Sequence, residues 1–214
     1  KTYGISGGLH GVGLSVVNAL SFQLHLDVRK NINLSRQWFG RGSIMSKLIK
    51  LKKSSLIHGT CIRFWPDDKI FPHVLIKTDY LMKKFKQQAF LNKKLTIYLT
   101  NERKRKIYKY FFKRGISSLV QEMNKKHTCI NKDVIHIESS HTKNNEKCIV
   151  SVSLQWNNTY KSNIKSFTNN IYNGQGGSHL SGFKSALTRS MNNYINKIFL
   201  KSNMKMMITG EDVR

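Results

Sequence analysis

A glycine-dense segment at residues 6–13, SGGLHGVG, runs directly into an apolar helical pattern. Leu14, Val17 and Leu20 recur after it at the spacing of one helix face. Glycines in such a loop let backbone N–H groups turn toward an anion, and the dipole of the following helix also favours negative charge there. The segment fits a phosphate-binding loop, and it equally fits a plain structural connector.

Two common phosphate-binding motifs do not fit this segment. A P-loop needs Gly-Lys followed by Ser or Thr, and the chain contains no Gly-Lys pair. A dinucleotide-binding fold needs a parallel βαβ unit with an acidic residue about 20 positions further on, and that pattern does not fit either. A nucleotide bound at this loop therefore belongs to another fold.

The rest of the chain mixes helical and strand patterns, which indicates an α/β fold. Thr60, Ile62 and Phe64 alternate with other residues before Pro66, as in a half-buried strand. We expect loops at residues 47–53 and 124–146. Helices are predicted at residues 14–20, 79–89, 116–123 and from Ser178 onward, and strands at 24–29, 31–39, 60–65, 95–99, 107–112 and, as a hairpin, 150–156 with 160–167.

The charge is strongly basic. Lys and Arg number 37 against 11 acidic residues, a formal net charge of +26. Such an excess attracts polyanions by neutralising phosphates and releasing counterions, so double-stranded DNA is the natural partner. The abundance of Lys, Asn and Ile has a second explanation, namely the drift of an AT-rich genome toward AT-rich codons. Composition alone does not separate the two.

One compact basic run lies at residues 103–106, in a turn between two predicted strands, with further lysines on the helix before it. It fits contact with a DNA backbone, and it also fits a solvated hairpin turn. The lysines on the helix are Lys83, Lys84 and Lys86.

The spacing of the cysteines and the length of the apolar runs indicate in which cellular compartment the protein works. Cys61, Cys129 and Cys148 form no CxxC pair, and no His pair stands at metal-ligand spacing, so we expect reduced thiols in a cytosol-like compartment and no metal site. No apolar run approaches the roughly 20 residues that span a bilayer. Because the chain starts at Lys1 without an initiator Met, we expect it to be part of a longer protein.

Several segments together resemble one family. KTYGISGGLHGVGLSVVNALS looks like the third nucleotide-binding motif of the GHKL ATPases, in the form used by the B subunits of type II topoisomerases. HGTCIRFWPD resembles the strand with the adenine-site threonine, and FTNNI, GGSHLSGFKSALTRSMNNYI and TGEDVR resemble the transducer domain. FTNNI and ALTRSMNNY look more like DNA gyrase than topoisomerase IV, which shares the first motif.

The resemblance implies an α/β (α+β) fold in two parts. Residues 1–114 would form the later half of a GHKL ATPase sandwich, and residues 115–214 would begin a transducer domain with a ribosomal-protein-like α/β fold.

The resemblance also implies an ATP site. The backbone of the glycine loop would wrap the triphosphate, with His10 acting through its main chain, and Thr60 would hydrogen-bond in the adenine pocket. Gly4 replaces a lysine common in the family. The catalytic glutamate and the Mg²⁺ ligand would lie upstream, so we expect no catalytic or metal-binding residue here. The ATP-binding residues are predicted to be Tyr3, Gly8, Leu9, His10, Gly11, Val12, Gly13 and Thr60.

By the same resemblance, the protein is expected to be the B subunit of an ATP-dependent type II DNA topoisomerase. It would use ATP and Mg²⁺ to close a gate on double-stranded DNA and produce negative supercoils. Its B subunits would dimerise with ATP and join gyrase A subunits as an A2B2 heterotetramer, in the bacterial cytoplasm at the nucleoid or in a plastid, without a membrane partner. The alternatives are the topoisomerase IV counterpart and a noncatalytic basic DNA-binding remnant.

Overall fold

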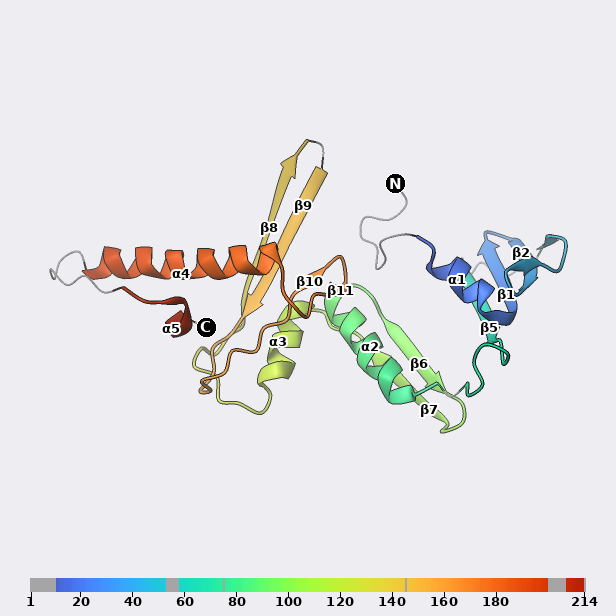
Figure 1. Ribbon diagram of the computed structural model, residues 1–214, viewed down its shortest axis with the longest axis horizontal. Helices are drawn as coiled ribbons and strands as arrows, with labels where there is room; N and C mark the ends of the chain where they lie inside the picture. Colours follow the sequence, from blue (N-terminus) through green and yellow to red (C-terminus); the bar gives the residue numbers. More distant parts are fainter. Residues whose placement is uncertain (1–10, 53–57, 75, 145, 200–206, 214) are drawn as a thin grey trace. The chain divides into compact units, whose positions relative to one another are not determined.

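The computed structural model describes residues 11–52, 58–74, 76–144, 146–199 and 207–213 (Figure 1). The chain divides into two compact units, which we call the first unit (Ser6–Lys77) and the second unit (Thr78–Arg214). Among the described residues, no helix is long and apolar enough to cross a membrane.

The first unit is a short helix on an antiparallel sheet. The strands follow the order β3-β2-β1-β5, and β4 also pairs with β2. The central strand β1 places Leu24, Leu26 and Val28 on one face, because successive side chains of a strand point to opposite faces. The elements are α1 (Gly13–Ala19), β1 (Ser21–Lys30), β2 (Asn33–Gly40), β3 (Ser43–Ile44), β4 (Ile49–Lys52) and β5 (Gly59–Pro66).

An ion pair fixes one end of this sheet. The Asp67 side chain is only 2% exposed and accepts hydrogen bonds from the Arg41 guanidinium, at the turn after β2, and from the Lys69 N–H at 3.1 Å. The bond from Arg41 holds the pKa of the Asp67 carboxyl below its usual value. The contact therefore ties the β2–β3 turn to the end of β5 with a charged carboxylate.

The second unit combines helices with three separate antiparallel strand pairs, β6–β7, β8–β9 and β10–β11. The longest element is the helix α4. The elements are α2 (Thr78–Leu91), β6 (Ile97–Asn101), β7 (Lys106–Tyr110), α3 (Ile116–Asn124), β8 (Ile135–Lys143), β9 (Glu146–Leu154), β10 (Phe167–Thr168), β11 (Ile171–Tyr172), α4 (Ser178–Phe199) and α5 (Gly210–Val213).

A small apolar core holds the start of the second unit together. At the end of α2, Ala89 is 0% and Phe90 3% exposed. The Phe90 ring stacks on Phe112, with centroids 3.7 Å apart and planes 23° apart. Gly115 then begins the turn into α3 with φ of +55°, a conformation that glycine adopts without steric cost. The chain thus reverses tightly beside the buried ring.

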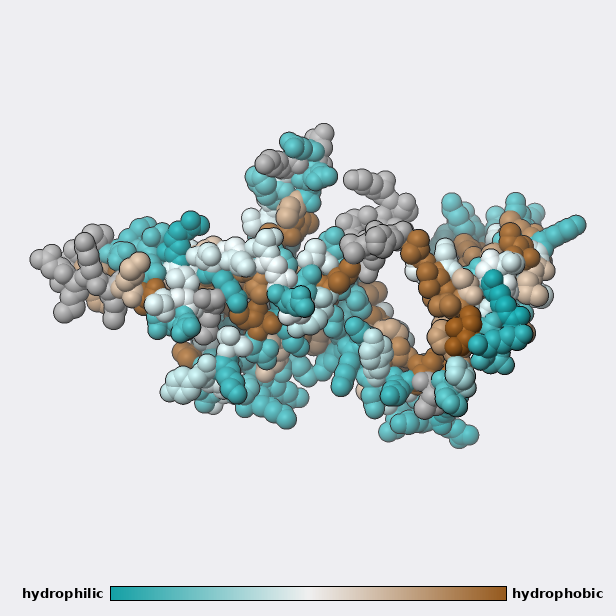
Figure 2. Space-filling view, viewed as in Figure 1, coloured by the Kyte–Doolittle hydropathy of each residue, from teal (hydrophilic) through white to brown (hydrophobic). Residues whose placement is uncertain are grey.

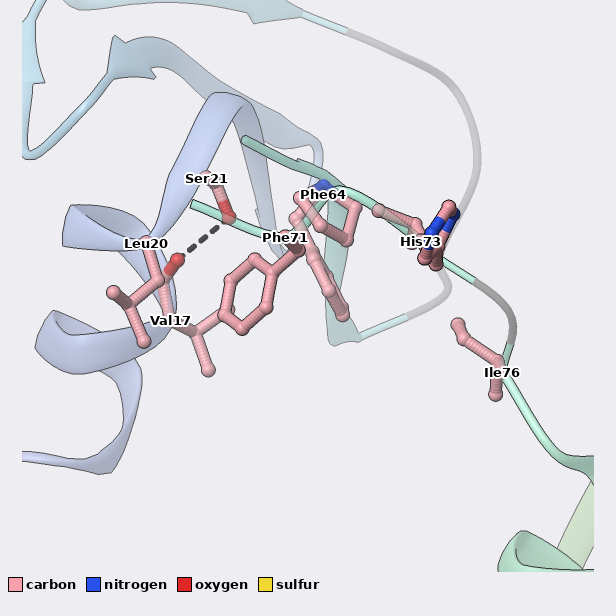
Figure 3. Close-up of a pocket in the computed structure, with 9 residues that line it drawn as sticks. Val17, Leu20, Ser21, Phe64, Phe71, His73 and Ile76 are labelled. Carbon is pink, nitrogen blue, oxygen red and sulfur yellow. Dashed lines mark hydrogen bonds between the residues drawn. The ribbon is translucent and has the colours of Figure 1, made fainter. Parts of the chain in front are cut away.

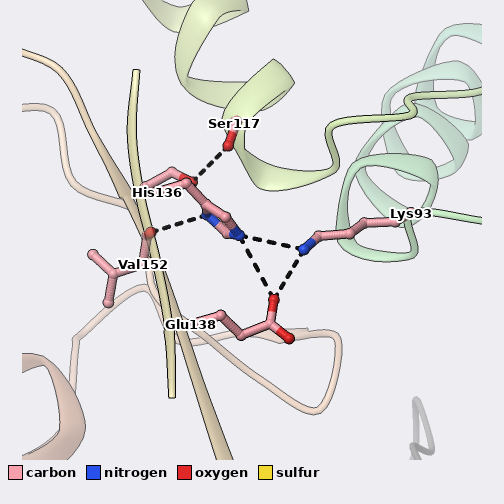
Figure 4. A network of polar contacts seen from close by, with 6 residues as sticks. Lys93, Ser117, His136, Glu138 and Val152 are labelled. Atoms are coloured by element: carbon pink, nitrogen blue, oxygen red, sulfur yellow. Dashed lines mark hydrogen bonds and ion pairs between the residues drawn. The ribbon is translucent and has the colours of Figure 1, made fainter. Parts of the chain in front are cut away.

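The β8–β9 ribbon is long and mostly exposed. Its strands pair without interruption from Ile135 opposite Leu154 to Lys143 opposite Glu146. At its base, the buried Ser117 of α3 shares a 3.1 Å hydroxyl hydrogen bond with Ser153 of β9. Figure 4 shows the neighbouring polar cluster, in which Lys93 Nζ lies 2.9 Å from a Glu138 carboxylate oxygen and 3.3 Å from His136 Nε2.

Most predicted elements are confirmed, including all four helices and the strands at residues 24–29, 31–39, 60–65, 95–99 and 107–112. Four expectations are wrong. Residues 49–52 of the predicted loop form β4, an exposed edge strand where lysines are tolerated. The strand that pairs with β9 is β8, inside the predicted loop at 124–146, whereas residues 160–166 form no strand. Residues 59–65 of β5 are exposed, not half-buried.

Candidate nucleotide-binding site

The structure describes four of the eight predicted nucleotide-binding residues. Gly11, Val12 and Gly13 lie at the entry to α1, and Thr60 lies on β5. The other four, Tyr3, Gly8, Leu9 and His10, lie outside the described residues.

The entry to α1 presents backbone donors. Val12 is the N-cap, with φ −95° and ψ −1°, and no side chain caps the helix. The first intrahelical bond runs from the Val16 N–H to the Val12 carbonyl at 2.9 Å. The N–H groups of Gly13, Leu14 and Ser15 precede this bond and therefore have no acceptor within the helix. The first turn contains no acidic residue, so its positive end is not neutralised there.

Glycines at the entry to α1 leave the backbone without side chains there. Gly11 has φ of +67°, a left-handed conformation that favours glycine. A Cβ atom added at Gly11 or at Gly13 would meet no other heavy atom of the described residues within 4 Å. The backbone can therefore approach a bound anion without a side chain in between.

The sheet beneath α1 offers an apolar surface with one hydroxyl group. Thr60 pairs with Val28 and Ile62 pairs with Leu26, and these side chains share one face by strand alternation. Val28 is 39% and Ile62 41% exposed. A flat heterocycle would find apolar contact there and one polar group for orientation, as is typical of small-molecule sites.

A pocket between α1 and β5 shows that the helix lies over this same face. Its volume is about 270 Å³. Figure 3 shows Val17, Leu20 and Phe64 around it, and Phe64 shares the Thr60 face by alternation. The pocket is mainly apolar, and its only drawn hydrogen bond runs from Ser21 Oγ to the Val17 carbonyl at 2.6 Å. The lining residues are Val17, Leu20, Ser21, Phe64, Pro66, Phe71, His73, Val74 and Ile76.

Sequence reasoning missed the segment that closes this pocket. Phe71, His73, Val74 and Ile76 follow β5 outside any helix or strand. Their only signal is the run FPHVLI, too short and without periodicity, so no element could be assigned to it.

The described residues do not provide a metal site. They contain no group of three His, Cys, Asp or Glu side chains close enough to hold an ion. In the first unit, Asp27 and Asp67 are each bonded by an arginine, Arg36 and Arg41. Both carboxylates are therefore already engaged by guanidinium groups.

Proteins with similar sequences match this chain over almost its whole length. Residues 115–214 match the family model described as DNA gyrase B. The B subunit of DNA gyrase from Clostridium acetobutylicum is 41% identical over 99% of this chain, which spans 33% of that protein. Its counterpart from Campylobacter jejuni is 40% identical over 100% of the chain, which spans 27% of it. The chain therefore covers about a third or less of these relatives' lengths.

Solved structures agree in fold. The 43K ATPase domain of Thermus thermophilus gyrase B, in complex with an aminocoumarin, superposes with a TM-score of 0.84 at 26% identity, covering 95% of this chain and 55% of that one. The topoisomerase IV ATP-binding domain of Francisella tularensis gives 0.74 at 28% identity, over 97% and 56%. These neighbours confirm the expected α/β fold of the GHKL ATPases. Along its whole length the chain is therefore similar to the B subunits of DNA gyrase, with relatives near 40% identity and a shared fold.

Proposed function

We propose that this chain supplies the phosphate loop and the adenine-side strand of the ATP site in the B subunit of a DNA gyrase. The observation that carries the proposal is the entry to α1. Open N–H groups at Gly13, Leu14 and Ser15 follow a left-handed Gly11, at the position of the family's glycine motif. Backbone donors at a helix start are suited to phosphate oxygens.

In this proposal, the site residues that the structure describes bind ATP or hold it in position. The N–H groups of Gly13, Leu14 and Ser15 donate to the triphosphate, and the backbone of Gly11, Val12 and the preceding loop lies against it. The Thr60 hydroxyl hydrogen-bonds the edge of adenine, while Val28 and Ile62 contact its ring. Fixed donors aimed at phosphate oxygens also stabilise charge that develops during hydrolysis. The general base and the Mg²⁺ ligands belong to other parts of the protein, so this chain alone binds ATP without hydrolysing it.

We further propose the whole-protein context. Residues 1–114 belong to the ATPase domain and 115–214 to the transducer, a division supported by the family match that starts at residue 115. The protein uses ATP and Mg²⁺, dimerises through its B subunits with ATP, and forms an A2B2 heterotetramer with gyrase A. It works on double-stranded DNA in the cytoplasm. The structural likeness to a topoisomerase IV domain supports the topoisomerase IV counterpart as the second candidate.

The test is a plasmid assay with the full-length protein, gyrase A, ATP and relaxed circular DNA. We expect negative supercoils that form only with ATP. ATP-dependent relaxation or decatenation without supercoiling would identify topoisomerase IV instead. DNA binding without ATP hydrolysis would leave only the basic DNA-binding remnant.

The second unit carries a basic surface suited to the DNA backbone. The turn between β6 and β7 exposes Arg103, Lys104, Arg105 and Lys106. It is ordered by a 3.0 Å hydrogen bond from the Lys104 N–H to Asn101 Oδ1. Figure 2 shows hydrophilic side chains gathered over the β6–β7 strand pair. Residues 77–126 contain 15 basic and three acidic residues, so the surrounding field is strongly positive.

Changing Arg103, Lys104 and Lys106 together to Gln should weaken binding to duplex DNA. Each phosphate contact contributes about −0.9 to the slope of log K against log salt concentration, so the slope should become shallower by roughly 2–3. Fluorescence anisotropy with a labelled duplex at several salt concentrations measures it. A control that changes the exposed Lys132, Lys161 and Lys165 to Gln removes the same charge elsewhere. Equal slopes in both triple variants would show a general charge effect and no specific surface.

A further inference from the structure

The sheet of the first unit has a second face, opposite the one that carries Thr60. Alternation places His25 on this face at the centre, beside Trp38 of β2, which is its direct cross-strand partner. Trp65 and Arg63 of β5 lie on its other side. We call these residues, His25, Trp38, Arg63 and Trp65, the tryptophan face.

The aromatic rings of the tryptophan face form one cluster. His25 stacks on Trp38 with centroids 5.1 Å apart and planes at 26°, and it meets Trp65 edge-on at 4.9 Å and 66°. The two indoles nevertheless remain 38% and 41% exposed. His25 Nε2 is buried within the cluster and has no hydrogen-bond partner among the described residues. The cluster thus presents flat ring surfaces and one unsatisfied polar atom.

Positive charge borders these rings. Asp27, next to His25 on the same face, is already bonded by Arg36 through two contacts of 2.7 Å. Asp27 is outnumbered on this face by Arg36, Arg63 opposite His25 and Arg29 further along β1, so the face keeps a net positive charge. Exposed aromatic rings flanked by arginines match a ligand that has flat rings joined by anionic links.

We propose that the tryptophan face binds single-stranded nucleic acid, with bases stacked on Trp38 and Trp65 and phosphates near Arg63 and Arg29. Sequence-tolerant stacking on aromatic side chains, combined with a basic surface, is the general mode of single-strand binding. A duplex keeps its bases stacked inside and offers only its backbone, and an acidic peptide offers charge without flat rings. The face is opposite the Thr60 side, so this binding is independent of the proposed ATP site.

The experiment uses the full-length protein and a fluorescein-labelled oligothymidylate of about 16 nucleotides, the upper range of a single-strand site. Anisotropy gives Kd for the wild type, Trp38→Ala and Arg63→Gln. We expect Trp38→Ala to weaken binding about tenfold, as expected from the loss of one stacked base. Arg63→Gln should weaken it less and flatten its salt dependence. The controls are Tyr160→Ala and Lys161→Gln, an exposed aromatic residue and an exposed cation in the second unit, and neither should change Kd.

Photocrosslinking locates the contact. An oligothymidylate containing 5-iododeoxyuridine should crosslink to Trp38 or Trp65, identified by mass spectrometry of the digested protein. The proposal is overturned if Kd is unchanged in Arg63→Gln and crosslinks fall elsewhere, or if duplex DNA or polyglutamate competes at the face as well as the single strand. If the circular dichroism spectrum shows that Trp38→Ala does not fold, the Kd of Arg63→Gln and the positions of the crosslinks test the proposal instead. Binding of a fluorescent ATP analogue should be unchanged in Arg63→Gln, which separates this result from the ATP proposal.

Discussion

Replacing Gly11 with valine is expected to weaken ATP binding by the full-length protein at least tenfold and to abolish ATP-dependent supercoiling. Gly11 has φ of +67°, and a β-branched residue is a true outlier there. Strain of about 1–3 kcal/mol would move the loop out of this conformation. The N–H groups before α1 would then no longer converge on the triphosphate. Titration with a fluorescent ATP analogue measures binding, and the plasmid assay measures the activity.

Gly11→Asn is the matched control for this prediction. Asparagine tolerates the left-handed region better than other residues with a side chain, so its affinity for ATP should lie between those of glycine and valine. The space beside Gly11 is open, so size alone does not explain a loss in the free protein. Equal losses in Asn and Val would point to a clash with the bound nucleotide. Wild-type affinity in Gly11→Val would refute the role of the loop.

Phe90→Ala is expected to destabilise the second unit by about 3–5 kcal/mol, the usual cost of emptying a buried aromatic site. The ring is 3% exposed and stacks on Phe112 beside the fully buried Ala89. Few other large side chains are buried in the described part of this unit, so neighbours cannot easily collapse into the space. Thermal melting should show the loss, and hydrogen exchange should show faster opening of β6 and β7.

Tyr80→Ala tests whether the stability lost in Phe90→Ala comes from the buried ring. Tyr80 lies on the same helix but is 60% exposed, and its ring lies under Lys84 Nζ at 5.6 Å from the centroid. Changes at exposed positions are usually within about 0.5 kcal/mol. If both variants lose equal stability, burial of the Phe90 ring is not what holds the unit together.

The helices and most strands were predictable because their patterns are local. Leu14, Val17 and Leu20 repeat at the helical period, and β5 alternates cleanly before Pro66. The glycine loop was recognisable because few backbone geometries need so many glycines. The family resemblance then indicated Thr60, an ordinary strand threonine by pattern alone.

What the sequence did not reveal depends on contacts between distant segments. β8 alternates only from Ile135 to Glu138 and is polar beyond, which is too short a pattern, so its pairing with β9 identifies it. β4 is a strand because β2 offers it hydrogen bonds. The tryptophan cluster was hidden because Trp38 and Trp65 are 27 positions apart and meet only through the register of β1.

The β8–β9 ribbon has a consequence for handling the protein. A two-stranded ribbon is at best marginally stable in water, and no further strand among the described residues pairs with the outer edges of this one. Ile137, Ile149 and Val150 add exposed apolar surface to it. Open edges with apolar side chains invite strand addition from another molecule. Association of this chain on its own should therefore rise with concentration, and it should begin at the ribbon.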